Sequence, residues 1–162
     1  MIDTPSRRDR DESGRPRNAR PRDALGRPLP PGSTGVPRIP DDLCLPVSQT
    51  LSYAQHLMDD GLAFNAHEVL EAAWKCGPDS ERLLWQSLAQ LAVGLTHIQR
   101  GNVGGATALL RRAGDGLTRV HRPVPHSVDA DGLIAYAALL VDDLAAGTQI
   151  APTRLRPRLT AS

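Results

Sequence analysis

Residues 81–100 read ERLLWQSLAQLAVGLTHIQR, and this stretch decides the fold. Its apolar residues recur at helical spacing on most sides, which is typical of a central helix packed among others. Three of its polar residues lie on the same side of this helix. At about 100° per residue, Gln86, Gln90 and His97 fall within about 40° of one another and form a single polar ridge.

Four further segments have helical periodicity, and no segment has a sustained period of two. Short connections between most of them predict that neighbouring helices pack as antiparallel pairs. Ser48 and Asn102 are the expected N-caps, and Gly61 and Gly101 the expected helix ends. The sequence therefore predicts an all-α fold, a single compact bundle of about five helices over residues 48–60, 63–76, 80–100, 102–120 and 130–146.

One expected helix contains HEVLE, a histidine and two glutamates within five positions. His67 and Glu71 are four residues apart and share one row of the helix, whereas Glu68 lies on its flank. Phe64 and Trp74 lie on that row, one at either end. Because aromatic side chains are usually buried, we expect the row to face protein or a pocket.

These two polar rows predict one polar cluster inside the bundle. A buried polar group without a partner costs about 1–3 kcal/mol, so the rows are expected to face each other across the helical hairpin or to line a wet cleft there. An ionised Glu71 would raise the pKa of a neighbouring His67. The expected binding cluster consists of Phe64, His67, Glu71, Trp74, Gln86 and Gln90.

The net charge of +1 is unevenly distributed. Residues 1–40 hold nine arginines against five acids, with eight prolines, and are expected to be a disordered basic arm. Residues 41–147 are expected to form the bundle and residues 148–162 a short, loose basic tail. The N-terminal arm has no aromatic residue to stack on a base, so nucleic acid is the less favoured partner of these basic arms.

Cys44 and Cys76 lie 32 positions apart without a CxxC pair, which predicts neither a disulfide framework nor a zinc site. No apolar run approaches the roughly 18–20 residues needed to cross a bilayer. The start of the chain also lacks the apolar region of a secretory signal. We therefore expect a cytoplasmic protein with reduced thiols and no membrane partner.

The run FNAHEVLEAAWK at residues 64–75, followed by LLWQSLAQLAVGLTHIQRGNVGGATALLRRA at 83–113, resembles the domain-of-unknown-function family 309. The family pattern is an aromatic residue, then A-H-E-x-x-E-x-x-W, a Q-x-x-x-Q-like helix and an R-G-N-x-x-G-A turn. The resemblance spans about residues 45–145 and implies a small all-helical bundle. It implies no established activity, substrate or cofactor.

Three interpretations of the HEVLE helix stay open at this point. The favoured functional one is a binding or assembly module with a protein or small-molecule partner. The alternative is a metal-dependent hydrolase, in which His67 and Glu71 hold the metal and Glu68 or Glu71 acts in catalysis. It lacks the second histidine of H-E-x-x-H and an obvious third ligand at that spacing. The third interpretation is a buried polar network that only sets helix register.

Overall fold

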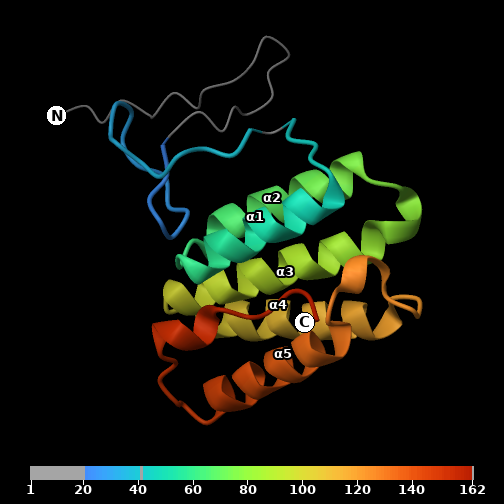
Figure 1. Cartoon of the computed structure of the whole chain (residues 1–162). Coiled ribbons are helices and arrows are strands. Elements are labelled where there is room, and N and C mark those ends of the chain that lie inside the picture. The colour runs from blue at the N-terminus through green and yellow to red at the C-terminus, as the bar shows by residue number, and fades with distance from the viewer. Residues whose placement is uncertain (1–20, 41, 162) are drawn as a thin grey trace, which may run out of the picture.

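Helices are the main secondary structure in the part of the chain that the structure describes. The computed structural model describes residues 21–40 and 42–161, and strands are absent from these ranges apart from two isolated β-bridges. The predicted all-α class and the five helices are confirmed (Figure 1). The helices are α1 (Val47–Asp59), α2 (Ala63–Cys76), α3 (Arg82–Gln99), α4 (Val103–Arg119) and α5 (Ala130–Ala145).

Local sequence signals mark where several helices begin and end. α3 ends shortly before Gly101, whose φ of 75° suits glycine. α4 begins after Asn102, whose side-chain oxygen accepts a hydrogen bond from the Gly105 N–H at 3.0 Å. The expected cap at Ser48 is wrong, because α1 begins one residue earlier, after Pro46, and has no side-chain cap.

The helices pack in chain order, each mainly against the next. α3 lies in the middle of this stack and has ten buried residues out of 18, more than any other helix (Figure 1). Glycine allows α3 and α4 to approach closely, since a Cβ at Gly94 would lie 3.0 Å from the Leu110 side chain. α3 is thus the central helix, as its sequence predicted.

The end of the expected N-terminal arm is packed on the bundle. Residues 1–20 lie outside the described residues, but residues 21–40, hereafter the strap, have defined positions. Ile39 of the strap is only 3% exposed and joins the core. Two guanidinium groups contact the Phe64 ring of α2, that of Arg22 of the strap at 5.2 Å and that of Arg100 at 5.8 Å from its centroid. These contacts offset part of the ordering entropy that led us to expect disorder here.

The C-terminal tail also packs against the bundle, which corrects the expectation of a loose segment. Leu155, Pro157 and Leu159 are buried, whereas the arginines between them are exposed. Gln55 of α1 anchors the tail, donating to the Pro157 carbonyl at 2.8 Å and accepting from the Leu159 N–H at 2.9 Å. Alternation with a period of two is the pattern of an extended segment with one buried face. It is visible in the sequence LRPRL but is too short to have been recognised as such.

The two cysteines form a disulfide, with Cα atoms 5.9 Å apart, which overturns the expectation of reduced thiols. α1 and α2 pack against each other, and this brings Cys44, just before α1, to Cys76 at the end of α2. A separation of 32 residues carries no sign of that contact, because only the pairing of the helices creates it. The disulfide removes the argument for a reducing compartment on which the cytoplasmic expectation rested.

No helix within residues 21–40 and 42–161 is both long enough and apolar enough to cross a bilayer.

Removing the disulfide should destabilise the protein without changing its helices. A cross-link over a loop of this size is expected to contribute about 3–4 kcal/mol by restricting the unfolded chain. The double variant Cys44→Ser, Cys76→Ser should lose that much unfolding free energy in urea titrations followed by circular dichroism. Dithiothreitol should destabilise the wild type and leave the double variant unchanged. Two reactive thiols per native, non-reduced chain would contradict the pairing.

Candidate functional site

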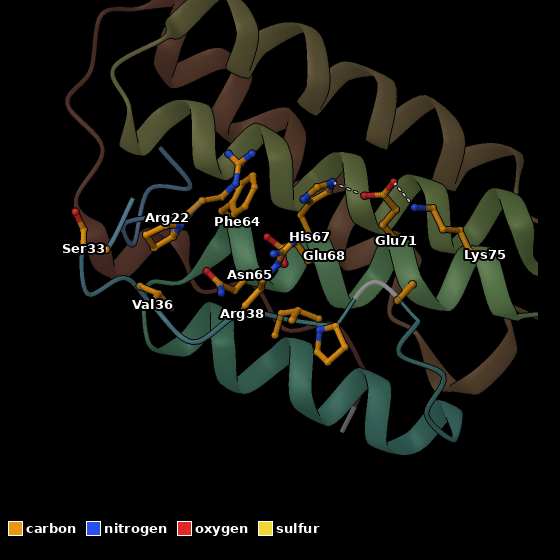
Figure 2. A pocket seen from close by; sticks show the side chains of 15 residues that line it. Arg22, Ser33, Val36, Arg38, Phe64, Asn65, His67, Glu68, Glu71 and Lys75 are labelled. Atoms are coloured by element: carbon orange, nitrogen blue, oxygen red, sulfur yellow. Dashed lines mark ion pairs between the residues drawn. The ribbon is translucent and has the colours of Figure 1, made fainter. Parts of the chain in front are cut away.

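Three side chains of α2 are paired in a row along one face of the helix, Glu71 with both His67 and Lys75. The Nε2 of His67 lies 3.2 Å from Glu71 Oε2, and the Nζ of Lys75 lies 3.2 Å from Glu71 Oε1. The spacing of four residues places all three on one row (Figure 2). One turn before them, the Phe64 ring lies 5.5 Å from the His67 ring, tilted by 48°. Both oxygens of Glu71 are therefore already engaged by cationic or polar partners.

This row lines a pocket of about 540 Å³ between α2 and the strap. Figure 2 shows the α2 side chains on one wall and the strap residues Arg22, Val36 and Arg38 opposite them. Most of its lining is polar or charged, with an apolar part from the strap and α2. The α2 wall consists of Phe64, Asn65, His67, Glu68, Glu71, Ala72 and Lys75, and the strap wall includes Arg22, Ser33, Val36, Arg38 and Ile39.

The structure does not bring Gln86 and Gln90 to this row. Gln86 is exposed and Gln90 half-buried on α3, and neither lines the pocket. Among residues 21–40 and 42–161, no hydrogen bond joins either glutamine to His67 or Glu71. The polar site therefore lies between α2 and the strap, where we had expected it between α2 and α3.

The reason is the opposite face of α2. Ala66, Val69 and Leu70 are no more than 1% exposed and form the helix's contribution to the core. They lie about 60–160° around the helix from His67 and about 100–160° from Glu71, so a helix that buries them turns its polar row away from the core. The sequence contained this signal, because the same helical wheel shows the apolar face. What it lacked was any sign that the strap would cover the polar one.

Trp74 belongs to a different environment from Phe64. It is half-buried, does not line the pocket, and has the Arg82 guanidinium 5.3 Å from its ring centroid. Its indole nitrogen is buried without a hydrogen bond in the described structure. Of the two aromatic residues expected to flank the site, the structure brings only Phe64 into it.

Burial lowers the pKa of His67 below the usual 6.5, the opposite of the shift expected from the sequence. Loss of solvent is the largest cause, and Lys75 and Arg22 add to it as positive charges. Glu71 and the backbone of Phe64 act in the other direction but do not outweigh burial. The imidazole is thus neutral at neutral pH, and its Nδ1 is buried without a hydrogen bond of good geometry.

The donor set fits a metal poorly. Within the described ranges, no three His, Cys, Asp or Glu side chains gather as a metal site would require. The expected metal pair, His67 and Glu71, is adjacent, but the Lys75 ammonium holds one oxygen of Glu71. A cation at this pair would have to displace that ammonium. Glu68, the expected base of a hydrolase, lines the same pocket.

The titration of His67 tests this electrostatic arrangement. An NMR titration of its ring should give a midpoint below 6.5, because the folded protein disfavours the charged form. Since the unfolded chain then binds the proton first, this residue should make the fold less stable as pH falls from 6.5 through the folded midpoint. Lys75→Met should raise the midpoint, and Lys75→Arg should leave it nearly unchanged. A wild-type midpoint above 6.5 would contradict the lowered pKa.

Comparison with known proteins agrees with the motif. Residues 51–109 match the family model described as Domain of unknown function (DUF309). A segment of 62 residues is 40% identical to the uncharacterized protein YpuF of Bacillus subtilis (strain 168), covering 38% of this chain and 36% of that protein. The chain thus spans about a third of the length of the curated relative it matches. No solved structure matches. Over residues 51–109 the chain therefore matches the family DUF309, as its motif indicated. The matched residues include the α2 wall of the pocket but not the strap.

Proposed function

We propose that this protein is a binding module for small molecules and that its site is the pocket between α2 and the strap. The observation that carries the proposal is the pocket itself, with its mixture of apolar side chains and converging polar groups. Its volume of about 540 Å³ is typical of sites for small ligands. A buried group with a perturbed pKa in such a pocket, here His67, is a further mark of a ligand site.

The same geometry favours binding over metal-dependent hydrolysis. That reaction needs a metal held by about three protein ligands and an activated water. The described residues offer His67 and Glu71, with the second already paired to Lys75. The strap forms one wall of the pocket, and a bound molecule would be held between this wall and α2.

Filling the pocket should abolish binding. We expect Val36→Trp to project an indole from the strap into the space next to α2, since Val36 lines the pocket and is half-buried. Leu139→Trp is the matched control, because Leu139 is 59% exposed on α5 and lies outside the pocket. A set of anionic, cationic and neutral small molecules would be titrated against ¹⁵N-labelled protein.

At least one class should shift amide resonances of α2 and the strap in the wild type and in Leu139→Trp. In Val36→Trp the same molecules should cause no shift. If no class perturbs these segments, or if Val36→Trp binds as the wild type does, the pocket is not a binding site.

A further inference from the structure

The geometry points to a small oxyanion, an organic carboxylate or phosphate, as the ligand of this pocket, attracted by the positive charges of Arg22, Arg38 and Lys75 in its lining. This inference rests on the proposed function and specifies the chemistry of its ligand. The charges that line the pocket, the engagement of its carboxylates and the state of its aromatic ring each contribute to it.

Positive charge exceeds negative charge in the lining. Arg22 and Arg38 stand on the strap and Lys75 on α2, against the two carboxylates of Glu68 and Glu71. The positive groups come from both walls, so a molecule between the walls meets cations on two sides. At His67 the nearby charges act in both directions, since Glu71 favours its protonated form and Lys75 and Arg22 disfavour it. An anion entering here lowers the electrostatic free energy of the site.

The carboxylate of Glu71 does not present an open site for a cation. Its Oε2 lies 3.2 Å from His67 Nε2 and its Oε1 lies 3.2 Å from Lys75 Nζ. A cationic ligand would have to replace the ammonium. An oxyanion needs no such exchange, because it adds a partner to Lys75, whose side chain is 61% exposed and can reach toward it.

The aromatic ring of the pocket is already covered. Guanidinium groups of Arg22 and Arg100 lie 5.2 Å and 5.8 Å from the Phe64 centroid. Any side chain at Gly26 would overlap the same ring. A ligand that bound mainly by stacking would have to compete with these groups for the ring. Polar and charged contacts with the walls are what the pocket still offers.

A matched series of ligands tests the sign of the charge. Succinate, succinamide and putrescine have the same four-carbon length but carry negative, neutral and positive ends. Malate adds a hydroxyl group to succinate, and inorganic phosphate represents the second oxyanion. Each would be titrated at constant ionic strength against ¹⁵N-labelled wild type and Lys75→Gln. Lys75→Arg serves as the control that keeps the charge, and Arg111→Gln as a control outside the pocket, where Arg111 is exposed on α4.

We expect succinate, malate or phosphate to shift α2 and strap resonances and the other two molecules to leave them in place. Lys75→Gln should weaken oxyanion binding by about three- to tenfold, the range for one partly exposed charge contact. Lys75→Arg and Arg111→Gln should bind within about twofold of wild type. Added sodium chloride should weaken binding in all of them, because such contacts are screened.

Binding of succinamide or putrescine in the pocket, with no binding of the oxyanions, overturns the inference and leaves the proposed function standing. Equal oxyanion affinity in the wild type and Lys75→Gln also overturns it, since Lys75 would then not receive the ligand. Absence of binding by every molecule in the series and in the broader set refutes both proposals.

Discussion

The burial of one face of α2 is the constraint on which the site depends. Ala66, Val69 and Leu70 pack into the core, and each is almost completely removed from water. Burying three such side chains contributes several kcal/mol, more than the single contact between the neutral His67 and Glu71 can. Because residues on a helix have fixed angular positions, the core face dictates where the polar face points. The polar motif is therefore turned to the outside of the bundle.

The strap converts this outward-facing row into the wall of a pocket. Its docking depends on Phe64, whose ring contacts the guanidinium groups of Arg22 and Arg100 and lies against Gly26. Gly26 has a φ of 76°, and a Cβ at this position would overlap the Phe64 ring. Both the backbone conformation and the close approach to Phe64 therefore require glycine. Covering the row removes water from His67 and lowers its pKa. The same contacts that order the strap thus give the site its electrostatic character.

The far end of the pocket is tied by a covalent bond. Lys75 and Pro40 both line the pocket, and Cys76 and Cys44 lie close after them in the sequence. The disulfide therefore joins the end of the α2 wall to the chain that leaves the strap wall. Together with the ring contacts at Phe64, it holds the two walls at both ends. The strap lies outside residues 51–109, so one wall belongs to the family match and the other to the segment that precedes it.

The sequence by itself determined the all-α class, the five helices and the shared row of His67 and Glu71. Each follows from local periodicity and from capping signals such as Asn102 and Gly101, which act within one or two helical turns. It also contained the apolar face of α2, which excludes that polar row from the core. Tertiary structure alone decided the partner of the row, the disulfide and the sign of the His67 pKa shift. These depend on segments distant in sequence, the strap against α2 and Cys44 against Cys76, and no local pattern encodes the free energy of bringing such segments together.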